Sequence, residues 1–178
     1  FETAHRRKDG SLWPVEVSAT YRNTAGGEIY VFMRDISARK QAEIDVAKAN
    51  NLLYEAIRSI AEGFTIYDEN DRLIVCNEAY LDFYNTSRDL IVPGATFEQI
   101  VRKGAERGQY QDAIGRIDEW ISERVKKHQA ADGSHLEQLL GDGRWLLIIE
   151  DRTPSGYIVG NRIDITARKQ AEVELERH

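Results

Sequence analysis

The sequence predicts an α+β chain in which three strands and a helix precede a larger unit of five strands with flanking helices. Three observations predict this organisation. The string DISARKQAE at residues 35–43 recurs as DITARKQAE at 164–172, with Thr166 in place of Ser37. Short apolar stretches between turn-forming residues precede each copy, as in antiparallel strands. Apolar residues spaced by four and three follow the first copy, which indicates a helix.

Composition limits the classes of function. The chain has 178 residues and a formal net charge of -6, which argues against a nucleic-acid binder because such proteins usually carry a basic face. Cys76 is the only cysteine, so no disulfide can form within the chain and a reducing, cytoplasmic compartment is expected. No apolar run approaches the ~20 residues that span a bilayer, so we expect no membrane contact. The opening FETAHRRKDG resembles the middle of a domain and suggests a fragment of a longer protein.

Residues 1–36 are predicted to form three antiparallel strands. LWPVEVSATY at 12–21 alternates apolar and polar residues, and EIYVFMRDI at 28–36 is another apolar run. Turn signals lie at residues 9–10 and 25–27. Three strands are about the minimum for a stable sheet, and an apolar face would remain uncovered. We expect that face to dock on a partner surface or on a second chain.

The helix that follows carries a heptad pattern. Apolar residues recur at intervals of 4, 3, 4, 3 and 4, at Ala42, Val46, Ala49, Leu53, Ala56 and Ile60. This spacing is typical of a coiled-coil seam and predicts a homodimer through the helix. The alternative is a single amphipathic helix that lies on its own domain. The second copy of the string has the same register, at Ala171, Leu175 and His178.

The larger unit begins near residue 61. Strands are predicted at 64–67 and 73–76 around an acidic turn, and three more at 135–140, 144–153 and 157–165. Asn77 and Thr96 are suitable N-caps for helices at 78–84 and 97–108. A longer helix is predicted at 110–128, with the apolar stripe Tyr110, Ile114, Ile117, Ile121 and Val125.

These motifs resemble the PAS/PAC sensor domain family. GFTIYDENDRLIVCNEAY is similar to the first two strands and following helix of such domains, GDGRWLLIIEDRT to their later paired strands, and DITARKQAE to their exit into a helix. HRRKDGSLWPVEVSA and DISARKQAE repeat the last two features. The resemblance implies a PAS fold with a five-stranded antiparallel sheet at 61–166. It also implies the last three strands of a truncated PAS unit at 1–36, a helical connector at 37–60 and the start of an output helix at 167–178.

The resemblance also implies a function. The chain would be a sensory and dimerisation module that passes a signal through coiled-coil helices to a downstream domain of the same parent chain. That domain would be a histidine kinase or a diguanylate cyclase or phosphodiesterase. The alternative is a ligand-free scaffold that only dimerises and sets helix register. The chain itself shows no phosphate-binding glycine loop, nucleophile elbow or zinc-type cluster, so we expect no enzyme activity and no metal site.

The family's cavity lies between the sheet and the helices. The resemblance places it here at Phe97, Ile100, Ile117, Trp120, Ile121, Leu139, Leu146, Ile148 and Val159. The alternative is that these side chains fill the core completely. The polar groups that could point inwards are Arg116, Glu150 and Arg152. A bridge between Glu150 and Arg152 on one strand face is the simpler expectation.

Two cofactors found in relatives are not expected. The flavin-binding cysteine of such relatives lies on a helix, whereas Cys76 ends a predicted strand and is expected to be a small core residue. His128 is the candidate for a haem ligand, but next to Lys126 and Lys127 it is expected to be a cation at the helix C-terminus, where the dipole favours it.

Four residues are candidates for signal relay, namely Asp35, Ser37, Asp164 and Thr166. Each aspartate lies just before a helix, where its carboxylate can bind free backbone N–H groups, and the hydroxyls are alternative caps. The simpler interpretation is a helix cap worth about 1 kcal/mol. The functional interpretation is that the same contact couples movement of the sheet to the exit helix.

Overall fold

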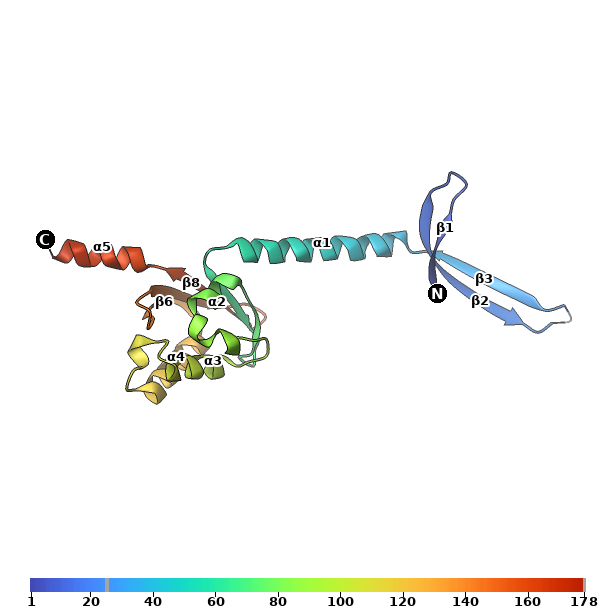
Figure 1. The fold of residues 1–178 in the computed structure, drawn as a ribbon. Helices are drawn as coiled ribbons and strands as arrows, with labels where there is room; N and C mark the ends of the chain where they lie inside the picture. Colours follow the sequence, from blue (N-terminus) through green and yellow to red (C-terminus); the bar gives the residue numbers. More distant parts are fainter. Residues whose placement is uncertain (25, 178) are drawn as a thin grey trace. The chain divides into compact units, whose positions relative to one another are not determined.

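The computed structural model describes residues 1–24 and 26–177 and divides the chain into two units, Phe1–Glu55 and Ala56–His178 (Figure 1). The first unit contains the strands β1 (Glu2–Arg6), β2 (Leu12–Arg22) and β3 (Glu28–Asp35), which form a three-stranded antiparallel sheet in this order. The sheet buries Val15 and Val17, whereas every residue of β3 is exposed. Of the predicted turn at 25–27, Ala25 lies outside the described residues.

Helix α1 (Ser37–Ser59) follows β3 and contains no buried residue. The predicted seam positions Val46 and Leu53 are 61 % and 59 % exposed. Ile60 lies one residue beyond the helix, because the helix ends at Ser59 rather than at 60 as predicted. The apolar stripe of α1 is therefore not covered by the sheet of the first unit.

The second unit has the predicted α+β fold with a five-stranded antiparallel sheet. Its strands are β4 (Gly63–Tyr67), β5 (Leu73–Cys76), β6 (Asp132–Leu139), β7 (Trp145–Arg152) and β8 (Ile158–Asp164), in the order β5-β4-β8-β7-β6. The helices α2 (Glu78–Phe83), α3 (Phe97–Glu106) and α4 (Ile117–Ala130) come between β5 and β6, with 3-10 segments at Asn85–Leu90 and Gln111–Ala113. Helix α5 (Thr166–Glu176) leaves from β8.

Two predicted helix caps are confirmed. The Asn77 side chain accepts from the backbone N–H of Tyr80, and Thr96 forms a capping box with Gln99. The long helix predicted at 110–128 is wrong at its start, because α4 begins at Ile117. Gly115 has φ +77, a left-handed conformation that a continuous helix from 110 to 128 would not allow. Ile114, predicted to lie on the apolar stripe of that helix, is 61 % exposed.

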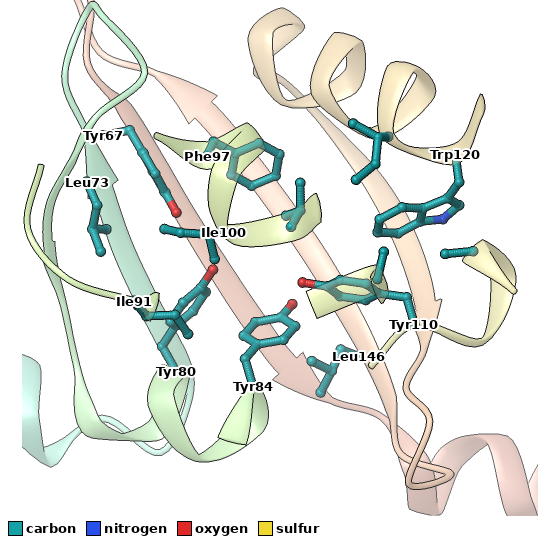
Figure 2. Close-up of a cluster of buried hydrophobic side chains, with 14 of the residues drawn as sticks. Tyr67, Leu73, Tyr80, Tyr84, Ile91, Phe97, Ile100, Tyr110, Trp120 and Leu146 are labelled. Atoms are coloured by element: carbon teal, nitrogen blue, oxygen red, sulfur yellow. The ribbon is translucent and has the colours of Figure 1, made fainter. Parts of the chain in front are cut away.

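The core lies between one face of the sheet and the helices (Figure 2). Side chains alternate along β7, so that Leu146, Ile148 and Glu150 face the core and are buried. Among the described residues no helix combines the length and the hydropathy needed to cross a bilayer.

Most of the predicted pocket residues belong to this core. Phe97, Ile100, Trp120, Ile121 and Leu146 lie in one buried cluster, against which Ile117 packs. Leu139 and Val159 were assigned to the wrong face. Gln138 pairs with Leu146, which is buried on the core face, so the adjacent Leu139 points to the opposite face of the sheet. Gly160 pairs with buried Thr65, so the adjacent Val159 also points to that opposite face.

Candidate functional site

A charged cluster lies in the core, with Glu150 at its centre. The Glu150 carboxylate accepts two hydrogen bonds from Arg124 on α4, at 3.1 and 2.9 Å, and one from Arg162 on β8, at 2.7 Å. All three side chains are at most 5 % exposed. Burial alone raises the pKa of the Glu150 carboxyl, but Arg162 and Arg124 together outweigh burial and hold that pKa well below its ordinary value. The carboxylate is therefore ionised, and its charge ties α4 to two strands.

His128 extends this cluster to the edge of the sheet. Its Nδ1 lies 3.1 Å from Glu150 and its Nε2 lies 2.9 Å from Asp71, so both ring nitrogens are next to a carboxylate oxygen. The imidazole ring stacks on Phe97, with ring centroids 3.7 Å apart and an interplanar angle of 6°. Asp71 reaches the ring from the β4–β5 turn, in a left-handed conformation with φ +63.

His128 lies in the last turn of α4, as expected. Its side chain, however, is 1 % exposed and lies in the core. The helical spacing of Trp120, Arg124 and His128, four residues apart each time, places all three on the buried face of α4. This spacing was the signal in the sequence that could have found the cluster. With both ring nitrogens against carboxylates, His128 does not fit the role of an axial haem ligand.

The other polar candidates lie elsewhere. Of the three named from the sequence, Glu150 points inwards, but the predicted bridge between Glu150 and Arg152 is absent from the ion pairs of the described residues. Arg152 is exposed and donates to the backbone oxygens of Gly156 and Gln129. Arg116 is partly exposed and bonds two glutamates of its own helix. Sequence reasoning missed Arg124 and Arg162, whose partner is distant along the chain.

Cys76 ends β5, as expected, and packs against the core. Burial raises the pKa of its thiol to about 11, so the thiol stays protonated at neutral pH. Both its position on a strand and its protonation fit a small core residue rather than a flavin-binding nucleophile.

The predicted relay residues meet in pairs where the sheets pass into helices. The Asp35 carboxylate accepts from the backbone N–H of Ser37 at 2.8 Å, and the Asp164 carboxylate accepts from that of Thr166 at 2.9 Å. The isoleucine between each pair is buried, at 4 % exposure for Ile36 and 7 % for Ile165. Each repeated string thus starts a helix with an apolar anchor and with an aspartate, one residue before the N-cap position, that accepts from the N–H of the first helical residue. This contact is called the aspartate cap below.

The repeated Arg-Lys pair binds a strand glutamate at both junctions. Arg39 and Lys40 contact Glu2 on β1, and Arg168 and Lys169 contact Glu137 on β6. The two glutamates occupy equivalent positions. Val15 pairs with Asp35 and Leu146 with Asp164, and one residue further along β2 and β7 the partners are Glu2 and Glu137. The string therefore encodes one way of attaching a helix to a sheet, used twice.

Comparison with known proteins agrees with this fold. Residues 57–173 match the family model described as PAS fold. The non-motile and phage-resistance protein of Caulobacter vibrioides is 29 % identical over 147 residues, which cover 81 % of this chain and 15 % of that protein. Albumin-2 of Pisum sativum is 31 % identical over 105 residues, which cover 52 % of this chain and 42 % of that protein. The solved PAS domain of Bordetella pertussis BvgS has 18 % identity and a TM-score of 0.42, and the match covers 73 % of this chain and 96 % of that one.

Proposed function

Because this chain belongs to the PAS fold family, we propose that it is a sensory and dimerisation module that relays a signal from the core of its second unit into helix α5. The output domain would be a histidine kinase or a cyclic-dinucleotide enzyme downstream in the same parent chain. The lone thiol fits a cytoplasmic location.

One observation carries the proposal, namely the set of contacts that α1 and α5 share in their attachment to the sheets. An aspartate cap, a buried isoleucine and an Arg-Lys pair on a strand glutamate recur at both junctions. Starting a helix needs only the cap, so the cap does not explain why Glu2 and Glu137 occupy equivalent positions in the two sheets. The repeated set supports a rigid coupling in which movement of a sheet turns or shifts the helix that follows it.

Strand β8 supplies the path from the core to the exit helix. Arg162 lies in the charged cluster, and Asp164, two residues later on the same strand, caps α5. Arg162 pairs with Ile148 of β7, and Asp164 pairs with Leu146 of β7. Arg162 and Asp164 are therefore held by the same pair of strands. A change of charge near Arg162, or the binding of a molecule there, would therefore shift the backbone of β8 that positions Asp164 at the start of α5.

Dimerisation rests on the stripe of α1. Five seam residues are exposed in the single chain, namely Ala42, Val46, Ala49, Leu53 and Ala56. Apolar side chains at heptad spacing favour pairing with a second helix.

The second candidate function is a ligand-free scaffold that holds two chains in register. It is favoured by the close packing of the predicted pocket residues, several of which are fully buried.

Cysteine crosslinking tests both the dimer through α1 and the relay into α5. In a Cys76→Ala background, Val46→Cys should crosslink two chains much faster than Ala47→Cys, which lies off the seam; equal rates would contradict the dimer.

Ala171→Cys on α5 then reports the relay. Its crosslinking rate should change when Glu150→Gln is added, while the rate at Val46→Cys stays constant. A folded Glu150→Gln protein with an unchanged rate at Ala171→Cys would favour the scaffold.

A further inference from the structure

The side chain of His128 connects α4 to three other parts of the second unit. Its ring lies between the carboxylates of Asp71, in the β4–β5 turn, and Glu150, on β7, at N–O distances of 2.9 and 3.1 Å. The ring also stacks on Phe97, the first residue of α3, and lies edge-on to Tyr67 of β4 at a centroid distance of 5.0 Å. A change in this one side chain therefore reaches the turn, the sheet and the start of α3.

The number of protons on the ring decides how many of these contacts it can make. A neutral imidazole carries a single N–H, so only one of its nitrogens can donate to a carboxylate, while the lone pair of the other nitrogen faces an oxygen. A protonated imidazole donates from both nitrogens. A bridge from Asp71 through the ring to Glu150 therefore needs the charged form of His128.

Charged groups of both signs surround the ring. On α4 itself, Arg124 lies one turn before His128 and on the same buried face. Arg162 of β8 binds the Glu150 oxygen that also contacts the ring. Asp71 supplies the second carboxylate, from the β4–β5 turn. These guanidinium and carboxylate groups act on a charge at the ring in opposite directions.

Within this cluster, His128 is the group suited to respond to pH near neutrality. Although burial raises it, the pKa of the Glu150 carboxyl is held well below its ordinary value by Arg162 and Arg124. Burial raises the pKa of the Tyr67 hydroxyl well above its ordinary value, so this group keeps its proton. Histidine, in contrast, ordinarily changes its charge between about pH 5 and 8.

The Asp71 end of the bridge is the end that can open. The Asp71 side chain is 21 % exposed, whereas that of Glu150 is 5 % exposed and is held by two guanidinium groups. A surface cavity of about 410 Å³, lined in part by Asp71 and Gln129, brings solvent to this end. The carbonyl oxygen of Asp71 accepts from the backbone N–H of Phe97 at 3.0 Å, so the turn also holds the start of α3.

We propose that His128 is a proton-operated latch: its charged form holds the β4–β5 turn to α4 and β7, and its neutral form releases the turn. In either neutral tautomer the contact with Asp71 is no longer an ion pair, so the hold on the turn weakens. The inference rests on the proposed sensory function, because it names the proton as an input to the charged cluster. It is independent of the dimer seam, which lies on α1.

NMR of the whole chain, labelled with 15N, tests the latch between about pH 5 and 8.5, a range that covers the ordinary titration of histidine. At the acidic end both ring nitrogens of His128 should carry protons, and one should lose its proton as the pH rises. Over the same range, hydrogen exchange of the backbone amides of Asp71 and Phe97 should speed up about tenfold after correction for intrinsic rates, as for the loss of a charged hydrogen bond.

Asp71→Asn is the decisive variant. Asparagine keeps the shape of the side chain and tolerates the left-handed conformation at this position, where φ is +63. The variant should fold and should show fast exchange at positions 71 and 97 at every pH. His128→Gln should behave in the same way, and if it does not fold, Asp71→Asn decides by itself. The matched control is His135→Gln on β6, which removes an exposed histidine and should keep the full pH dependence.

Three results would overturn the proposal. They are a His128 ring that keeps one protonation state across the whole pH range, a ring that titrates without any change in exchange at Asp71 and Phe97, or a pH dependence that persists in Asp71→Asn. If the latch fails while the crosslinking at Ala171→Cys still responds to Glu150→Gln, the relay stands without a proton input. If the latch opens with pH and the crosslinking does not respond, the relay alone fails.

Discussion

The backbone N–H of Trp145 donates a 3.0 Å hydrogen bond to the hydroxyl of Thr166, which itself donates to Asp164 at 2.6 Å. The first junction, between β3 and α1, lacks an equivalent bond. Its residue equivalent to Trp145 is Pro14, because Val15 and Leu146 pair with the two capping aspartates, and proline has no backbone N–H. The start of α5 is therefore tied to β7 by a bond that the start of α1 lacks. The single difference between the repeated strings, Ser37 against Thr166, falls at the residue that accepts this bond, although both side chains carry a hydroxyl group.

Thr166→Val should loosen the start of α5. It removes one acceptor and one donor while keeping the shape of the side chain, so we expect a loss of about 1 kcal/mol of local stability. Hydrogen exchange of the backbone amides at 166–170 measures it. Ser37→Ala, with no strand bond to lose, should change the amides at 37–41 less; an equal effect at both junctions would contradict the role of Trp145.

The attachment of α5 should depend on pH through Glu137. Hydrogen bonds from Lys169 and Arg168 hold the pKa of this carboxyl below its ordinary value of 4.5. A lowered folded-state pKa means that the stabilisation is fully present above about pH 4.5 and is lost as the pH falls through the folded-state value. Exchange of the α5 amides should therefore be slow at pH 7 and should speed up on acidification, after correction for intrinsic rates. Glu137→Gln should remove this pH dependence, and high salt should weaken the contact.

Glu150→Ala should be strongly destabilising. The substitution leaves Arg124 and Arg162 buried without their shared carboxylate, and breaking a buried ion pair in this way costs about 3–5 kcal/mol. Urea unfolding of the chain provides the measurement. The matched control is Glu119→Ala, which removes an exposed partner of Arg116 and should cost less than about 1 kcal/mol. Similar losses for both variants would mean that the cluster contributes little.

Gly141→Ala should disrupt the loop between β6 and β7. A Cβ there would lie 2.2 Å from the carbonyl oxygen of Gly108, and backbone atoms on both sides leave little freedom to adjust. We expect a loss of about 1–3 kcal/mol, as for other overpacked sites. The fall in Tm reports it. An unchanged Tm would show that the two loops, joined by the bond from Gly141 N–H to Gln109, separate easily.

Short-range features could be predicted from the sequence because they depend on neighbouring residues. Asn77 and Thr96 cap helices as predicted, since a side-chain cap needs only a residue three positions away. The resemblance to the PAS family also placed Leu146 and Ile148 correctly on the core side of their strand. Prediction failed at residues 110–116, where the apolar spacing suggested a helix but Gly115 adopts a left-handed conformation.

The pairing of the charged residues could not be predicted in this way. Glu150 lies 26 residues from Arg124 and 12 from Arg162, and its partners were decided by the packing of α4 against the sheet. The same holds for Leu139 and Val159, because a shift of one residue in strand register moves a side chain to the other face.

The sequence by itself determined the order of strands and helices, the caps and the repeated junction, all of which rest on local backbone geometry and on a motif printed twice. Only the tertiary structure decided that His128 is buried, that Arg124 and Arg162 meet on Glu150, and that Glu2 and Glu137 receive the Arg-Lys pairs. The physical reason is that such contacts join segments far apart in the chain, whose meeting depends on sheet register and core packing rather than on any local pattern.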